Sequence, residues 1–401
     1  MTDLLEYAGS QRTGTRSRRA DAVDLWSVLR RLDWLLLGAV LAIVGLGLWA
    51  ISDITAHDVP GNPNYFVKRQ AAYAAVGFVG LVVGALVDAD VWRRYWRWVF
   101  GGTVGAILLV FLQGQVRGSK RWIDLGAFRF QPSEFGKLLF VLALAGFLTE
   151  RGRRITGVDT ILRAFGLAAI PIVLVFLQPD LGTALVYTAS LGAILFVAGA
   201  RWTHLTIAGS VAVIAAVAVL WALPAAGVHV LKPYQQCRLT AFTHPSSANT
   251  ACGTYNIEQS KIAVGSGGTE GRGPRNATQT SYHFLPEHAT DFVFASYAEQ
   301  RGFVGASLLL ALYLLLVWRG LRVVAVARDL FSAVVAGGIV IGLLFQIFVN
   351  AGMTMAIAPI TGIPLPFFSV GGSSMIANLA AMGVLLGIHA RGRGARSARR
   401  R

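Results

Sequence analysis

Apolar residues run through this 401-residue chain in ten long segments, separated by short polar connections and one long connection. Most segments approach the roughly 20 residues that an α-helix needs to cross the apolar core of a bilayer. The segments are 34–52, 71–88, 97–113, 135–149, 160–177, 181–200, 204–223, 303–318, 331–353 and 367–388. The pattern predicts an all-α polytopic membrane protein with about ten transmembrane helices and one long extracytoplasmic loop, 224–302, between the seventh and the eighth.

Composition and charge support this class. Of all residues, 55% are hydrophobic and 14% are charged, which is far from the balance of a soluble domain. Basic residues precede the first segment, follow the last and occupy every second connection, so the positive-inside rule places both termini in the cytoplasm. This predicts a basic tail at 1–32, a membrane domain at 33–390 and a second basic tail at 391–401.

The net charge of +16 is spread over these turns and tails, with no soluble domain to form a groove. We therefore exclude nucleic-acid binding and attribute the basic excess to contact with anionic membrane lipids.

The long loop contains both cysteines of the chain, Cys237 and Cys252. By the charge pattern the loop lies outside, where an oxidising compartment would allow a disulfide, and two free thiols are the alternative. A glycine-rich run at 265–273 follows in the same loop. It is either a flexible linker or a segment that moves over a substrate.

Asp291 stands where this loop meets the eighth apolar segment. A carboxylate at such a boundary can be partly desolvated and still reach a water-borne substrate, which suits a general base or an ion site; a helix cap is the ordinary alternative. The polar triplet Glu299-Gln300-Arg301 lies too deep for a straight span that begins at Phe292. We therefore expect 285–301 to lie along the interface, the span to begin near Gly302, and Asp291 to lie at the mouth of a cavity.

Basic and acidic residues also occur near the third and fourth segments. Lys120 and Arg121 precede Trp122 on the outer side, as either an interfacial anchor or a site for phosphate or diphosphate. Glu134 and Lys137 share a helix face, and the plain interpretation is a helix start with Lys137 directed outward. A charge at the bilayer centre costs roughly 2.5–3.5 kcal/mol, so a pair inside the segment should instead face the interior and border a cavity.

Residues 359–374 contain three prolines and three glycines at membrane depth. Such backbone is tolerated in a bilayer when it is buried in protein or lines a wet cavity. The segment therefore predicts a cleft near the last span.

Five blocks of these residues resemble the SEDS family (shape, elongation, division, sporulation) in order and spacing: 118–126, 128–134, 178–183, 285–292 and 362–374. Blocks 128–134 and 362–367 are more similar to the RodA branch, which serves elongation, than to the FtsW branch, which serves division. The resemblance implies a peptidoglycan glycosyltransferase of the bacterial plasma membrane that polymerises lipid II on the outer face. It also implies a class B penicillin-binding protein and the elongation machinery as partners.

The resemblance further implies that Asp291 is the catalytic general base, which takes the proton of an attacking sugar hydroxyl. Positive charge must stabilise the leaving diphosphate, and a divalent cation (Mg²⁺ or Mn²⁺) is a candidate cofactor. The residues that we assign to substrate binding are Lys120, Arg121, Trp122, Glu134, Lys137, Lys261, Glu287, Thr290 and Ser373.

Two positions depart from the family pattern. Ala289 stands where the family has His, with His288 displaced by one, and Val370 replaces a Tyr. Neither change removes a proposed catalytic group, and His288 is not expected to replace the family's His. The alternative functions are a lipid II flippase, or another transporter of a lipid-linked substrate, and a scaffold that positions a transpeptidase.

Overall fold

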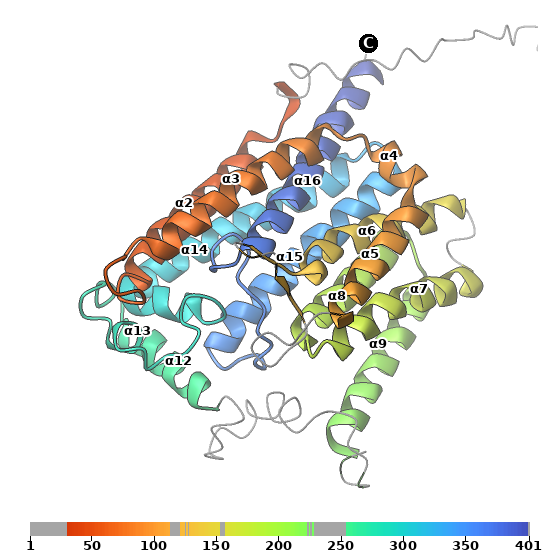
Figure 1. Cartoon of the computed structure of the whole chain (residues 1–401). Coiled ribbons are helices and arrows are strands. Elements are labelled where there is room, and N and C mark those ends of the chain that lie inside the picture. Colours follow the sequence, from red (N-terminus) through yellow and green to blue (C-terminus); the bar gives the residue numbers. More distant parts are fainter. Residues whose placement is uncertain are drawn as a thin grey trace, which may run out of the picture.

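The computed structural model describes residues 30–112, 121–124, 126, 128–152, 157–222, 224, 227 and 254–399 (Figure 1). Lys120 and both cysteines lie outside these ranges. The predicted role of Lys120 and the predicted disulfide between Cys237 and Cys252 therefore stay predictions.

Each of the ten apolar segments is occupied by one helix over most of its described residues. Seven helices are long and apolar enough to cross a membrane: α2 (Trp34–Ile54), α3 (Tyr65–Leu86), α6 (Pro132–Glu150), α7 (Val158–Leu177), α14 (Val293–Val326), α15 (Leu330–Thr354) and α16 (Gly372–Arg399). Three shorter apolar helices occupy the other predicted positions: α5 (Trp96–Leu109, continued by a 3₁₀ turn at Val110–Leu112), α8 (Leu181–Val197) and α9 (Trp202–Val217, continued by a π-helical turn at Ala218–Ala222). The chain is an all-α multi-pass membrane protein, as the hydrophobic pattern predicts.

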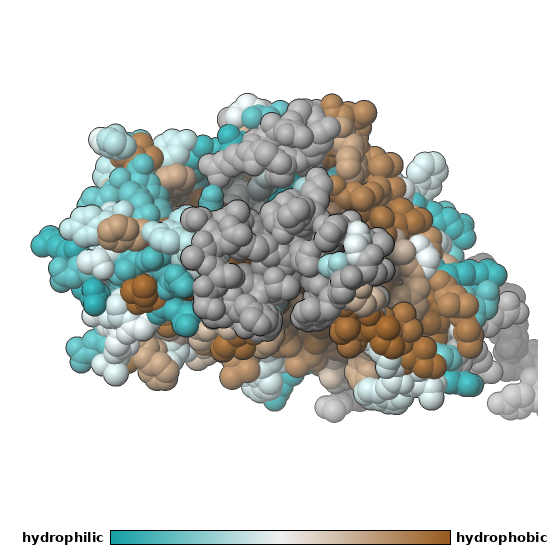
Figure 2. Space-filling model, turned by 90° about the horizontal axis from the view of Figure 1, so that it is seen from below, coloured by the Kyte–Doolittle hydropathy of each residue, from teal (hydrophilic) through white to brown (hydrophobic). Residues whose placement is uncertain are grey.

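The remaining elements are small. Helix α4 (Ala89–Arg94) connects α3 to α5, and strands β1 (Ile123–Asp124) and β2 (Arg129–Phe130) pair antiparallel, with Ile123 opposite Phe130. Helices α12 (Thr254–Ser266) and α13 (Thr278–Ser281) lie together at one end of the bundle (Figure 1). Seen from that end, hydrophilic residues gather over α12 and α13, and hydrophobic residues gather toward the side of α7 and α9 (Figure 2).

Helix α3 begins six residues before the predicted segment at 71, because its polar first turns are satisfied by hydrogen bonds. Arg69 donates to the hydroxyls of Tyr65 and Tyr73, one turn away on either side. Gln70 is fully buried. Its amide nitrogen donates to Ser369 O at 2.9 Å, and its amide oxygen accepts from Gly371 N at 3.1 Å. The connection between the first two predicted segments, 53–70, therefore ends earlier, at residue 64.

Helix α14 is broken at Gly302, whose φ of 64° and ψ of −165° are not helical. The predicted start of the span near Gly302 agrees with this break. Residues 293–300 are buried in protein, whereas we expected them at an interface. The glycine run packs against the break: Gly271 lies so close that a Cβ atom on it would be 2.3 Å from Gln300 O. Gly273 N donates to the same carbonyl at 3.0 Å, so the run is a packed connection and not a flexible linker.

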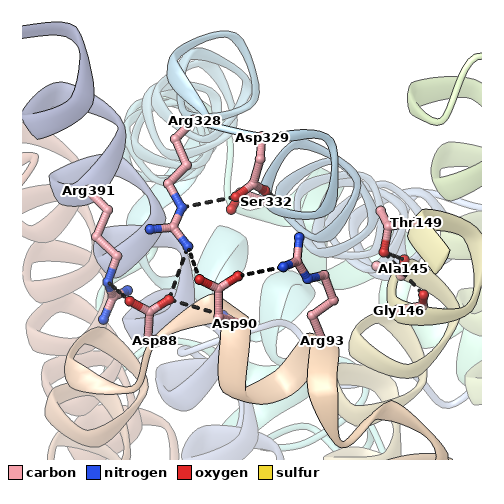
Figure 3. A network of polar contacts seen from close by, with 10 residues as sticks. All are labelled: Asp88, Asp90, Arg93, Ala145, Gly146, Thr149, Arg328, Asp329, Ser332 and Arg391. Atoms are coloured by element: carbon pink, nitrogen blue, oxygen red, sulfur yellow. Dashed lines mark hydrogen bonds and ion pairs between the residues drawn. The ribbon is translucent and has the colours of Figure 1, made fainter. Parts of the chain in front are cut away.

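At the opposite end of the bundle, charged side chains join two connections to helix α16 (Figure 3). Arg328, between α14 and α15, contacts Asp88 at 3.2 Å and Asp90 at 2.9 Å at the start of α4. Arg391 of α16 donates to Leu86 O at 2.7 Å. Helix α16 continues through the predicted basic tail as far as Arg399. These contacts hold the ends of α3, α14 and α16 together.

Candidate functional site

Asp291 lies on a tight turn, 287–292, that precedes α14. Within the turn, the Thr290 hydroxyl donates to the Glu287 carboxylate at 2.8 Å. From outside the turn, Ser369 Oγ donates to Thr290 O at 2.6 Å and Val370 N donates to Ala289 O at 3.0 Å. The Val370 contact uses the main chain, so the missing Tyr side chain does not affect it. The backbone around Asp291 is thus fixed from the side of the α15–α16 connection.

That connection, 355–371, has no regular secondary structure and is mostly buried. Asn350 of α15 donates both to Asp291 O and to Ile363 O, each at 2.8 Å. Gly362 has a φ of 72°, and a Cβ atom there would lie 3.3 Å from Asp291 Oδ2. The half-buried Asp291 carboxylate therefore lies directly against the irregular backbone. Burial in protein is one of the two settings that the sequence allows for this irregular backbone, and the predicted cleft beside it stays a prediction.

Gln70 of α3 also forms hydrogen bonds to the α15–α16 connection. Its two bonds to Ser369 and Gly371 flank Val370, whose N–H holds the Asp291 turn. The Ser369 hydroxyl in turn accepts from Leu365 N at 2.8 Å. The segment 355–371 lacks the regular backbone hydrogen bonds of a helix or a sheet. A buried amide that satisfies two of its backbone groups therefore stabilises one conformation of it. Gln70 is therefore a positioning residue for the turn.

Glu134 and Lys137 form a buried ion pair on α6, with Oε2 and Nζ 2.7 Å apart and side-chain exposures of 3% and 11%. Lys137 Nζ also donates to Gln346 Oε1 of α15 at 2.8 Å. The pair borders a small cavity of about 30 Å³ between α6, α8, α15 and α16, whose polar lining also includes Ser190 and Asn378. The inward orientation and the cavity agree with the second interpretation of the sequence, in which the pair faces the protein interior and borders a cavity, and not with an outward Lys137.

One helix face connects this cavity with the Asp291 turn. Gln346 and Asn350 are four residues apart on α15, which places them on the same face about 6 Å apart along the helix axis. Gln346 holds Lys137 and Asn350 holds the Asp291 backbone. Neither amide was among the predicted site residues, although two amides four residues apart in an apolar span are a detectable signal in the sequence.

The 178–183 turn organises a third polar group. Asp180 is buried and caps α8 by accepting from Thr183 N at 3.1 Å. Its other oxygen accepts from Gln131 Nε2 at 3.1 Å, and Arg121 lies beside it with the nearest N–O distance 4.0 Å. The Arg121 guanidinium is thus partly buried and close to an acidic partner, while Trp122 beside it is half-buried.

The other predicted binding residues have different surroundings. Ser373 is buried, and its hydroxyl donates to Arg129 O and accepts from Gln131 N, both at 3.0 Å, so it joins α16 to β2. Lys261 is exposed on α12. Glu287 is exposed and Thr290 is half-buried. Asp291, Glu287 and Thr290 therefore share one turn, whereas the Glu134–Lys137 pair lies at the cavity and Ser373 acts within the fold.

Glu299 is a further residue that the pattern of charges alone does not explain. It is fully buried and accepts three hydrogen bonds from the start of α13: Gln279 N at 2.9 Å, Thr280 N at 3.0 Å and Thr280 Oγ1 at 2.7 Å. Arg301 pairs with Asp53 at the end of α2. These contacts explain how charged residues are accommodated in this buried segment.

The fold and the site define a polytopic helical membrane protein with a carboxylate-bearing turn and, one helical turn away along α15, a small cavity bordered by a buried ion pair. The chain belongs to the FtsW/RodA/SpoVE family, also called the SEDS family, because the family's sequence model, described as "Cell cycle protein", matches residues 30–394.

Relatives and solved structures agree with this family. The chain is 36% identical over 358 residues to peptidoglycan glycosyltransferase MrdB of Escherichia coli (strain K12), covering 88% of this chain and 93% of the relative. It is 35% identical over 369 residues to stage V sporulation protein E of Bacillus subtilis (strain 168), covering 91% and 96%. Among solved structures, it is similar to a chain of a peptidoglycan synthase complex that coordinates polymerization and crosslinking, with a TM-score of 0.76, 30% identity and coverage of 90% and 98%.

The rod shape determining protein RodA of Thermus thermophilus is also similar, with a TM-score of 0.64, 29% identity and coverage of 89% of this chain and 96% of RodA. That protein was also solved as a variant in which one aspartate is replaced by alanine, with a TM-score of 0.65, 30% identity and coverage of 89% and 97%. Similarity to MrdB and RodA supports the elongation branch.

Proposed function

We propose that this chain is a peptidoglycan glycosyltransferase that polymerises lipid II on the outer face of the bacterial plasma membrane during elongation. Relatives that match this chain over nearly the whole length of both chains are named for that activity. The single observation that carries the assignment of the site is Asp291: a half-buried carboxylate on a turn fixed by Asn350, Ser369 and Val370. A general base must be held in place by its surroundings before it can accept a proton efficiently.

In this reaction the hydroxyl oxygen of the acceptor sugar forms a bond to the anomeric carbon of the growing chain. The proton of that hydroxyl passes to Asp291, and the bond from the anomeric carbon to the lipid diphosphate breaks. The fixed turn keeps the carboxylate in one place during the transfer.

The leaving diphosphate needs cations. Lys137 is held by Glu134 and Gln346, so we assign it to the cavity and not to the diphosphate. Arg121, 4.0 Å from Asp180, and the exposed Lys261 are the stronger candidates among the described residues. A divalent cation is a further candidate, because carboxylates such as Asp291 and Glu287 provide the oxygen ligands that Mg²⁺ and Mn²⁺ prefer.

We further propose a class B penicillin-binding protein as partner and a cytoplasmic location for both termini. Similarity to a chain from a complex that coordinates polymerization and crosslinking supports the partner. The basic residues before the first span and after the last support the orientation.

The test uses the full-length chain purified in detergent, supplied with lipid II with and without a class B partner, with glycan polymer detected on a gel. We expect Asp291→Asn to lose at least about 100-fold in polymerisation rate, the lower bound of general-base contributions. Glu270→Gln, an exposed carboxylate in the same loop, is the matched control. Equal polymer from Asp291→Asn would refute the general-base role. Absence of polymer from the wild type even with partner would favour transport or scaffolding.

A further inference from the structure

Three potential metal ligands meet near the Asp291 turn: Asp58, His283 and His288. They come from the α2–α3 connection, from the segment after α13 and from the turn itself. His288 Nε2 lies 3.1 and 3.2 Å from the two oxygens of Asp58, and His283 Nδ1 lies 3.8 Å from one of them. One ligand atom of each residue lies within 4.8 Å of those of the other two. The cluster therefore draws together segments far apart in the sequence.

The donor set is that of a transition-metal site. Two imidazoles and one carboxylate suit Zn²⁺ and similar ions, whereas Mg²⁺ prefers oxygen ligands and water. Metal–ligand bonds of about 2.0–2.1 Å in a tetrahedral site place ligand atoms roughly 3.3 Å apart. The spacing of Asp58 and His288 is close to this value. His283 is more distant, but its side chain is 49% exposed and its ring can rotate inward.

The backbones that carry the ligands are fixed. Asp58 N donates to Thr55 O at the end of α2, and Asp53 nearby pairs with Arg301. His283 has a φ of 57° and donates from its backbone to Thr280 O, on the short helix that Glu299 caps. Such an arrangement limits the backbone motion needed to bind an ion.

His288 is fixed through its carbonyl, which accepts from Ser296 Oγ at 3.0 Å. The carbonyl of the next residue accepts from Val370 N. The same two contacts hold the start of the Asp291 turn, so an ion on His288 would be attached directly to that turn.

A hydrogen bond between His288 and Asp58 is the simpler explanation for part of this geometry. It does not explain why His283 faces the same carboxylate at 3.8 Å, a distance too long for a hydrogen bond. The two imidazole rings also lie 5.2 Å apart, between centroids. An ion that accepts one ligand atom from each residue accounts for all three positions.

We propose that Asp58, His283 and His288 bind one transition-metal ion of the Zn²⁺ class. The ion ties the α2–α3 connection and the segment after α13 to the turn that carries Asp291. Water would complete the fourth position, since the half-exposed His283 leaves the site open to solvent. This site is distinct from one that would hold a cation against a diphosphate, because its imidazole ligands disfavour Mg²⁺.

The test measures metal binding directly and needs no activity. Full-length protein carrying a tag without histidine is stripped with a chelator and titrated with ZnCl₂, or with MgCl₂, in a calorimeter. We expect one Zn²⁺ per chain and no competition from Mg²⁺. His283→Ala, His288→Ala and Asp58→Asn should each weaken Zn²⁺ binding more than about tenfold, since losing a ligand should exceed the effect of losing an outer-shell partner. Bound Co²⁺ should give a visible d–d absorption that His288→Ala abolishes.

His57→Ala is the matched control, because His57 is exposed and next to Asp58 in the sequence. It should bind Zn²⁺ like the wild type. Unchanged Zn²⁺ binding in His283→Ala would overturn the proposal, and this variant should fold because the side chain is half exposed. Loss of the site in His57→Ala, or tighter binding of Mg²⁺ than of Zn²⁺, would overturn it as well.

Discussion

The buried ion pair between Glu134 and Lys137 allows a quantitative prediction. At 2.7 Å and an effective dielectric constant near 20, the attraction between the two charges is about 6 kcal/mol before desolvation is subtracted. Removing one partner of a buried pair typically destabilises by about 3–5 kcal/mol, because the other charge stays buried and uncompensated. We therefore expect Lys137→Met to lower the free energy of unfolding by about 3–5 kcal/mol.

Glu134→Leu should cost less than Lys137→Met. Lys137 keeps the Gln346 oxygen at 2.8 Å when Glu134 is removed, whereas Glu134 has no second cation among the ion pairs of the described residues. The double variant Glu134→Leu/Lys137→Met removes both charges, so its stability should be closer to the wild type than that of either single variant.

Equilibrium unfolding in detergent micelles, followed by circular dichroism, measures all four proteins. Lys68→Met is the control, since Lys68 is exposed on α3 and its loss should change little. Polymerisation of lipid II by the same samples separates stability from function: we expect the double variant to recover stability without recovering polymer. Strict additivity of the two single effects would refute the energetic coupling of Glu134 and Lys137. A Lys137→Met protein as stable as the wild type would refute it as well.

Two further predictions concern the backbone beside Asp291 and the opposite end of the bundle. Gly362→Ala should lower the polymerisation rate while leaving the chain folded. The alanine would have to adopt a left-handed backbone conformation, and its methyl group would lie 3.3 Å from Asp291 Oδ2. A wild-type rate would contradict the placement of the carboxylate. Asp329 is partly buried, which raises the pKa of its carboxyl, but hydrogen bonds from Ser332 and the charge of Arg328 outweigh burial and lower that pKa below its usual value. Its stabilising charge is therefore fully present above the unfolded pKa of about 3.9 and is lost as the pH falls through the lower folded value. Asp329→Asn keeps the helix cap, so its deficit in thermal stability at pH 7 should disappear in acid, and a deficit that is the same at every pH would contradict this origin.

The spans could be predicted from the sequence because each depends on a local run of apolar residues. The inward Glu134–Lys137 pair could also be predicted, since lipid penalises charge wherever the neighbouring helices lie. Gln70 precedes the second predicted segment, and its burial could not be predicted because its partners, Ser369 and Gly371, are about 300 residues away. Contacts of this kind depend on helix packing, which no local pattern contains.

The role of the glycine run at 265–273 also depends on packing that the local sequence does not contain. Its composition is typical of a linker, but a Cβ atom on Gly271 would collide with the backbone at Gln300. Whether a glycine provides flexibility or close packing depends on what lies beside it. His288 is similar: the sequence shows it as a displaced family residue, and its orientation toward Asp58 follows from the position of the α2–α3 connection.

Helix α15 holds two parts of the site with amides one turn apart, Gln346 at the Lys137 ammonium and Asn350 at the Asp291 backbone. A helix of 25 residues moves nearly as a rigid body, so an axial shift or rotation displaces both amides by a similar amount. The position of the Asp291 turn and the charge distribution in the cavity are therefore mechanically linked. Any force applied to the membrane-facing side of α15 acts on both at once.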